Sequence, residues 1–149
     1  LLYNEKGVVP EEEYLIPFGQ ANVIREGSDV TFVVWGPAVK DALKAADLLA
    51  AEGISVEVID PRTLVPFDWE TVFASVRKTG RCVAISQCVD VGSFTGEIVA
   101  QIMASCFDQL DAPVLKVGAK NGIAPQAHTL EVAFLPNAQD MVAAAKKLM

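Results

Sequence analysis

The stretch Asp29–Pro61, DVTFVVWGPAVKDALKAADLLAAEGISVEVIDP, decides the fold. Residues 30–35 form an unbroken apolar and β-branched run, which is typical of a strand covered on both faces. Gly36-Pro37 end this run, and residues 38–50 carry the apolar periodicity of a helix. Residues 54–59 predict a second strand. A strand, a helix and a strand with short joints form a right-handed βαβ unit, so the two strands should be parallel.

The remainder of the chain continues the alternation of strands and helices. Strands are expected over 21–25, 82–86 and 114–117, helices over 69–78, 94–110 and 138–149, and loops between them, with a short apolar run at 132–135. Asp68 is a good N-cap for the second helix, and Gly80 suits its end. This pattern predicts an α/β fold, a three-layer α/β/α sandwich on a mostly parallel sheet.

Composition restricts the classes of partner. The chain has 149 residues, of which 52% are hydrophobic, enough for the full core of one domain. The net charge is −7 and no basic run is present, so nucleic acid and anionic membranes are poor partners. No apolar run approaches the roughly 20 residues that a membrane span needs.

The first 20 residues are expected to form a tether, and residues 21–149 the domain. The tether combines Glu11–Glu13 with Pro10, Pro17 and Gly19, which favours extended backbone on a surface. The first residue is Leu, and the opening residues have the pattern of neither a signal peptide nor an Arg-rich transit segment. We therefore expect a piece of a longer polypeptide.

The cysteines and the histidine do not predict a metal site. Cys82, Cys88 and Cys106 are odd in number, form no C-x-x-C pair and have apolar neighbours, so we interpret them as small core residues in a reducing compartment. His128 is the single histidine, so the chain lacks the ligands of a zinc site. It lies in an expected loop with no nucleophile beside it, which favours a surface or interface role over a catalytic base.

Ligands of such sheets bind at the carboxyl ends of the strands. None of the loops at these ends is a phosphate loop. Trp35-Gly36-Pro37 has one glycine where a dinucleotide fingerprint needs three, and no P-loop motif occurs. The small residues of Gly92–Glu97 leave backbone N–H groups that could hold an anion, or they cap and pack the helix start. Taken alone, the residues indicate an α/β domain without an internal active site.

Several blocks of the sequence are similar to one enzyme family. The blocks are Gly27–Thr31 with Trp35-Gly36, Glu52–Ile54, Val58–Leu64, Pro66–Asp68, Ser75–Arg81, Leu110–Val114 and Leu135–Asn137. Together they resemble the carboxyl-terminal domain of the β-subunit of thiamine-diphosphate-dependent 2-oxo acid dehydrogenases. This family includes pyruvate, branched-chain 2-oxo acid and acetoin dehydrogenases, and the same domain type ends transketolase. Leu2-Tyr3 and Val9–Glu12 resemble the interdomain linker of that subunit.

The resemblance implies a five-stranded sheet with an antiparallel first strand at one edge. It implies an oxidoreductase that uses thiamine diphosphate and Mg²⁺, both held between other domains, so that this fragment binds neither and contributes no catalytic residue. The implied partners are the α-subunit, a second β-subunit and the dihydrolipoyl acyltransferase core. The implied location is the cytoplasm, or the mitochondrial matrix if the source is eukaryotic.

The resemblance also suggests subunit contacts at the strand ends. The candidate interface residues are Arg62, Leu64, Phe67, Gln87, Asp90, Phe94 and His128. Leu64, Val65 and Phe67 exposed together would form an unusual apolar patch on a monomer. The chain departs from the family at Ser86–Cys88, where members often have His-Glu-Ala, and at Asn121–Ile123, where they often have Asp-Thr-Pro. Because of these departures, the resemblance does not indicate which substrate the enzyme uses.

Two alternatives remain at this stage. One is a small-molecule-binding regulatory α/β domain that uses the helix start at Gly92–Glu97. The other is the equivalent domain of a transketolase-like enzyme, against which Arg62 and the block Lys78–Arg81 favour the dehydrogenase branch.

Overall fold

The computed structural model describes residues 7–149 and contains one five-stranded sheet. The strands are β1 (Asn22–Arg25), β2 (Val30–Val34), β3 (Val56–Asp60), β4 (Cys82–Val89) and β5 (Leu115–Ala119), and the helices are α1 (Ala38–Ala50), α2 (Trp69–Thr79), α3 (Phe94–Cys106), α4 (His128–Phe134) and α5 (Ala138–Lys146). The strand order is β1-β3-β2-β4-β5. β1 pairs antiparallel with β3 at one edge, and the other neighbours are parallel.

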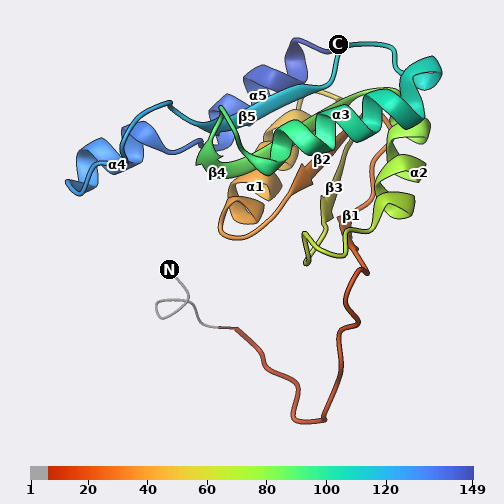
Figure 1. Cartoon of the computed structure of the whole chain (residues 1–149), viewed down its shortest axis with the longest axis horizontal. Coiled ribbons are helices and arrows are strands. Elements are labelled where there is room, and N and C mark those ends of the chain that lie inside the picture. The colour runs from red at the N-terminus through yellow and green to blue at the C-terminus, as the bar shows by residue number, and fades with distance from the viewer. Residues whose placement is uncertain (1–6) are drawn as a thin grey trace.

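The helices cover both faces of this sheet, which makes three layers. α1 and α5 pack over one face and α2 and α3 over the other, and Figure 1 shows α1 and α3 on opposite sides. The five residues of β2 are buried because the strand lies in the middle of the sheet. The expected α/β/α sandwich with an antiparallel edge strand is confirmed.

The ends of α2 and α5 follow from local hydrogen bonds. The Asp68 carboxylate accepts the N–H of Thr71 at 3.1 Å, as expected of an N-cap, and Gly80 ends α2 in the left-handed conformation. Asn137 forms a capping box with Asp140 at the start of α5. These helix boundaries were readable from the sequence because the capping residues contact their near neighbours.

Among the strand and helix ends that differ from expectation are those of β4 and α3. β4 continues to Val89 instead of ending at Ser86, because Val89 pairs with Ala119 of β5 after an irregularity in register. α3 ends at Cys106, short of the expected residue 110, and a short 3-10 helix follows, in which Phe107 is 64% exposed. Both differences arise from pairing and packing between elements distant in sequence.

α4 is a helix in a segment expected to be a loop. It has seven residues, no buried residue and no side-chain N-cap, so its sequence lacks the usual helix signals. His128 is its first residue, which corrects the expectation of a loop position. Figure 1 shows α4 projecting from one end of the molecule.

The tether (residues 1–20) runs away from the domain over its described part, residues 7–20 (Figure 1). Its apolar side chains are exposed, including Leu15 at 87% and Phe18 at 85%. Leu2-Tyr3, which resemble the interdomain linker, lie outside the described residues. Within residues 7–149 no helix has both the length and the apolar character needed to cross a bilayer.

Candidate functional site

The carboxyl ends of β2, β3, β4 and β5 meet at one edge of the sheet, called here the carboxyl edge, because these strands are parallel. Two grooves open there. Groove A is open, measures about 970 Å³ and lies between loop 64–67 and the start of α3. Groove B measures about 690 Å³ and lies between the start of α1 and α4.

Aromatic rings form the floor of groove A. The centroid of the Phe67 ring lies 4.2 Å from that of Trp69 and 5.8 Å from that of Phe94. Phe94 also meets Trp35 edge to face at 6.4 Å. Phe67 and Leu64 are therefore only half-buried surface residues, and Val65, 87% exposed, is the side chain that projects fully. The expected joint exposure of Leu64, Val65 and Phe67 thus holds for Val65 alone.

The start of α3 does not favour an anion. The side chain of Ser93, which precedes the helix, accepts no helical N–H, and its hydroxyl instead bonds to that of Thr95. The carboxylate of Glu97 lies in the first turn, lines groove A and accepts from the Gln101 amide at 2.8 Å. A negative charge at this position would repel a bound anion. Close packing does not explain the glycines either, because a Cβ on Gly92 or Gly96 would meet no atom within 4 Å, and Ser93 gives no side-chain cap.

Groove B lies where the connections of two adjacent strands leave to opposite faces. β2 leads to α1 on one face and β4 leads to α3 on the other, and such a switch point is where α/β sheets usually bind ligands. Gln87 and His128 line this groove together with Lys44 and Asp60. Lys44 is 3.0 Å from Asp41, and His128 is 3.9 Å from Glu131. The lining thus mixes both signs of charge.

The seven candidate interface residues all lie at the carboxyl edge, but not in one cluster. Leu64, Phe67 and Phe94 line groove A, and Gln87 and His128 line groove B. Asp90 lies 3.3 Å from Lys116, whose ammonium also donates to the Asp90 carbonyl. Arg62 donates to the carbonyls of Gln20 and Ala21, so its side chain holds the tether.

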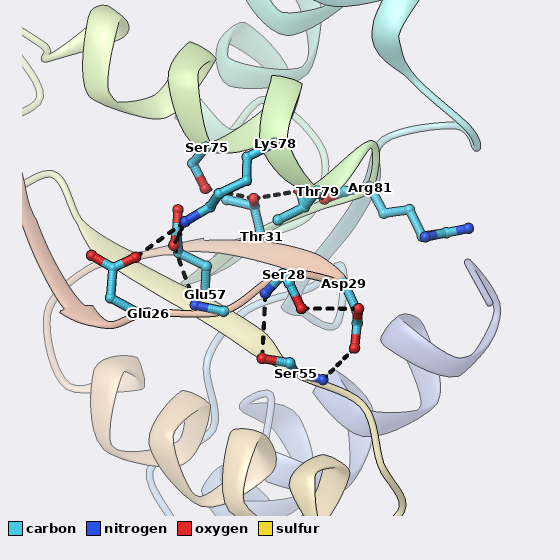
Figure 2. A network of polar contacts seen from close by, with 11 residues as sticks. Glu26, Ser28, Asp29, Thr31, Ser55, Glu57, Ser75, Lys78, Thr79 and Arg81 are labelled. Atoms are coloured by element: carbon cyan, nitrogen blue, oxygen red, sulfur yellow. Dashed lines mark hydrogen bonds and ion pairs between the residues drawn. The ribbon is translucent and has the colours of Figure 1, made fainter.

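The opposite edge carries a polar network that the sequence analysis did not identify (Figure 2). Glu57 of β3 has only 3% of its side chain exposed and forms an ion pair with Lys78 of α2. Lys78 also lies 3.1 Å from Glu26. Burial raises the pKa of Glu57, but hydrogen bonds from Lys78, Ser75 and Gly27 outweigh burial and leave it below its ordinary value. The bond to Glu57 raises the pKa of Lys78.

Hydroxyl groups complete this network. Thr31 of β2 lies 2.7 Å from the Ser75 hydroxyl and 2.8 Å from that of Thr79, all three being buried (Figure 2). Asp29 accepts the Ser55 N–H at 2.7 Å. All of these partners lie within the domain, so the network joins β2, β3 and α2 and serves stability. A glutamate in an otherwise apolar strand was the available signal for it.

Neither the cysteines nor the acidic residues form a metal site in the described part of the chain. Within residues 7–149, no group of three or more His, Cys, Asp and Glu could hold a metal ion. Cys82 and Cys106 are buried, as expected, and burial raises the pKa of both thiols. Cys88 is exposed, which corrects its expected place in the core.

Comparisons with known proteins agree with this picture. The pyruvate dehydrogenase E1 component subunit beta of Bacillus subtilis (strain 168) is 41% identical over 141 residues, which are 95% of this chain and 43% of the relative. The acetoin:2,6-dichlorophenolindophenol oxidoreductase subunit beta of Cupriavidus necator is 42% identical over 148 residues, which are 99% of this chain and 44% of the relative. The chain thus spans less than half the length of these curated relatives.

A solved structure and a family model extend the match. The structure titled "Split gene transketolase, inactive beta4 tetramer" superposes with a TM-score of 0.76 at 30% identity, covering 97% of this chain and 45% of that chain. The model described as transketolase, C-terminal domain matches residues 19–141. The expected resemblance to dehydrogenase β-subunits is confirmed over nearly the whole chain. The chain therefore belongs to the transketolase C-terminal domain family.

Proposed function

We propose that this chain is the carboxyl-terminal assembly domain of the β-subunit of a thiamine-diphosphate-dependent 2-oxo acid dehydrogenase. The whole enzyme would oxidatively decarboxylate a 2-oxo acid and transfer the acyl group to lipoamide. The observation that carries the proposal is the similarity to two β-subunits: 41% identity to that of a pyruvate dehydrogenase over 95% of the chain, and 42% identity to that of an acetoin:2,6-dichlorophenolindophenol oxidoreductase over 99% of the chain. The transketolase structure is 30% identical, which favours the dehydrogenase branch. Because the pyruvate and acetoin relatives are equally similar, the comparison does not decide between a 2-oxo acid and acetoin as the substrate.

The residues of this chain do not fit thiamine diphosphate with Mg²⁺. A diphosphate–metal site needs oxygen ligands and free N–H donors, but residues 7–149 offer no metal-ligand group, Pro37 lacks an N–H and Glu97 repels anions at groove A. In our proposal both are held by other parts of the enzyme. Isothermal titration of the chain with thiamine diphosphate and Mg²⁺ should detect no micromolar binding. Such binding would contradict the proposal that other parts of the enzyme hold both groups.

We propose the carboxyl edge as the surface that meets the α-subunit, a second β-subunit or the acyltransferase core. Residues 1–20 would link this domain to the preceding one, and residues 21–149 would form the domain. Gly19 is the first described residue whose backbone bonds to the domain, and the family match begins at the same residue. The compartment implied by the resemblance, cytoplasm or mitochondrial matrix, stays a prediction.

A chimera tests the assembly role. Residues 19–149 would replace the matching part of the Bacillus subtilis pyruvate dehydrogenase β-subunit, and copurification with its α-subunit and turnover would be measured. Val65→Glu should weaken assembly without lowering the melting temperature, because Val65 is 87% exposed. Phe107→Glu is the control, since Phe107 is 64% exposed beyond the end of α3. If both variants copurified equally well with the α-subunit, the proposal that the carboxyl edge is the assembly surface would be contradicted.

Groove B supports a second candidate, a small-molecule regulatory site. Its volume lies within the range of small-ligand pockets, and it occupies the switch point of the sheet. A metabolite screen by thermal shift on the chain would test it. A ligand of this groove should raise the melting temperature of the wild type but not that of Gln87→Trp, in which the indole fills the groove. A screen without any such ligand would remove this candidate.

A further inference from the structure

The point where the tether enters the domain is held by side chains more than 40 residues away in sequence. The Gly19 N–H donates to the Thr63 hydroxyl at 3.0 Å, and the Ala21 N–H donates to the Asp68 carboxylate at 2.8 Å. The Arg62 guanidinium donates to the Gln20 carbonyl at 3.1 Å and to the Ala21 carbonyl at 3.0 Å. Four hydrogen bonds therefore bind the last two tether residues and the first residue of the domain to one loop.

Two of the three holding side chains, Thr63 and Asp68, have a second partner within the loop or in the next helix. The Thr63 hydroxyl donates to the Pro66 carbonyl at 2.7 Å. The Asp68 carboxylate also caps α2 through the N–H and hydroxyl of Thr71. The backbone N–H of Arg62 donates to the Asp60 carboxylate at 2.9 Å, and Arg62 has φ +58°, a conformation that is unfavourable for a residue with a Cβ. The side chains of Thr63 and Asp68 thus bond both to the chain at Gly19–Ala21 and to their own surroundings.

The same loop forms one wall of groove A. Leu64, Val65, Pro66 and Phe67 line the groove, and they lie between Thr63 and Asp68 in sequence. Gly19 approaches this wall closely, since a Cβ on Gly19 would lie 3.1 Å from the Pro66 ring. A change in the position of the tether must therefore act directly on the wall of the groove.

We propose that Arg62, Thr63 and Asp68 form a clamp that fixes the direction of the tether and couples it to the shape of groove A. With the clamp closed, Gly19–Ala21 and loop 64–67 form one rigid unit. When the clamp opens, both the tether and the groove wall become mobile together. This inference does not depend on the dehydrogenase assignment, because it rests on contacts within the chain.

Amide hydrogen exchange on the chain of residues 1–149 tests the clamp. Arg62→Gly removes both guanidinium bonds, while glycine suits the positive φ and preserves the fold. We expect exchange to rise about tenfold or more at the bonded amides of Gly19 and Ala21, and at those of Thr63 and Trp69, which flank loop 64–67 and report on it; this is the change implied by loss of bonds from a charged donor. Arg77→Ala is the control, because Arg77 also donates to a backbone carbonyl, that of Ser105, but at the other end of α2.

Thr63→Val provides a second, independent opening of the clamp, since it removes the acceptor of Gly19 and the donor to Pro66. It should give the same pattern as Arg62→Gly. Unchanged exchange at Gly19–Ala21 in both variants would show that the clamp does not hold the tether. Faster exchange at the tether with an unchanged loop 64–67 would overturn the coupling to groove A.

Discussion

At the scale of single residues, the segment from Glu26 to Thr31 is constrained at almost every position. Glu26 contacts Lys78, Ser28 bonds to Ser55, and Thr31 bonds to two hydroxyls of α2. This segment includes one of the blocks that carried the family resemblance. Its side chains join β2 to β3 and α2 at the edge opposite the grooves. The resemblance at this block therefore reflects the stability of the domain.

Gly27 offers a sharp test of this view. A Cβ on Gly27 would lie 2.2 Å from the backbone of Val56 and Glu57 in β3. To accommodate it, either β3 or the connection between β1 and β2 would have to move. Gly27→Ala should lower the free energy of unfolding by about 3 kcal/mol or more. Gly96→Ala is the matched control, since its Cβ would meet open space on α3, and it should stabilise by roughly 0.5–1 kcal/mol. Urea denaturation measures both; equal effects would refute the close contact.

Lys78→Met tests the buried carboxylate of Glu57. Glu57 would lose its cation while remaining buried, so the variant should be about 2–4 kcal/mol less stable near neutral pH. In the wild type the lowered pKa of Glu57 gives stability above its unfolded pKa, which is lost as the pH falls through the folded pKa. In the variant the bond from Lys78 is lost, so burial is opposed only by the remaining weaker bonds and the pKa of Glu57 should rise; protonation of Glu57 then relieves part of the loss of stability.

The defect of Lys78→Met should therefore shrink as the pH falls to about 4, where carboxyl groups take up protons. Denaturation at several pH values would measure this trend. Lys44→Met is the control, because Lys44 forms an exposed pair with Asp41 and should change stability by less than about 1 kcal/mol. A defect of constant size at all pH values would show that Glu57 does not cause it.

At the scale of elements, Asp68 joins the start of α2 to the entry of the tether. Burial raises the pKa of Asp68, but hydrogen bonds from Ala21 and Thr71 outweigh burial and lower it. The lowered pKa stabilises the fold above the unfolded pKa, and this contribution is lost as the pH falls through the folded value. One side chain thus supports two elements.

Asp68→Ala should lower the free energy of unfolding by about 1–2 kcal/mol, the usual effect of removing an N-cap. Asp68→Asn retains an acceptor oxygen and should be less destabilised than Asp68→Ala. Because it has no ionisable carboxyl group, it should lack the part of the stability that the wild type loses as the pH falls. Thermal unfolding from neutral to acid pH would compare them. If Asp68→Asn kept the full acid dependence of the wild type, the pKa assigned to Asp68 would be wrong.

At the scale of the whole molecule, the two ends of the sheet differ in character. The amino end is closed by the network of Glu57, Lys78 and Thr31, whereas the carboxyl end carries two grooves and the projecting α4. Exposed apolar side chains at the carboxyl end include Val65 at 87% and Ile123 at 96%. This asymmetry suits a domain that meets other parts of an assembly at one end.

Truncation tests the boundary between tether and domain. A chain of residues 19–149 should melt at nearly the temperature of the full chain, because residues 7–18 are exposed. A chain of residues 22–149 loses the four bonds to Arg62, Thr63 and Asp68 and should be about 2–4 kcal/mol less stable. If both truncated chains had the same melting temperature, the boundary between tether and domain would lie beyond residue 21.

The sequence by itself determined the elements whose signals are local. The apolar run 30–35, the helical periodicity of 38–50 and the caps Asp68 and Gly80 each act within a few residues, so the βαβ unit and the ends of α2 could be predicted. The absence of a phosphate loop was readable for the same reason. The three-layer fold followed from the alternation of these elements.

Only the tertiary structure decided which distant groups meet. The extension of β4 to Val89 depends on its pairing with β5, and the half-burial of Phe67 depends on the rings of Trp69 and Phe94. The role of Arg62 depends on tether carbonyls about 40 residues away. A sequence pattern reports the periodicity of one segment, whereas burial and hydrogen bonding across the sheet are fixed when separate segments pack against each other.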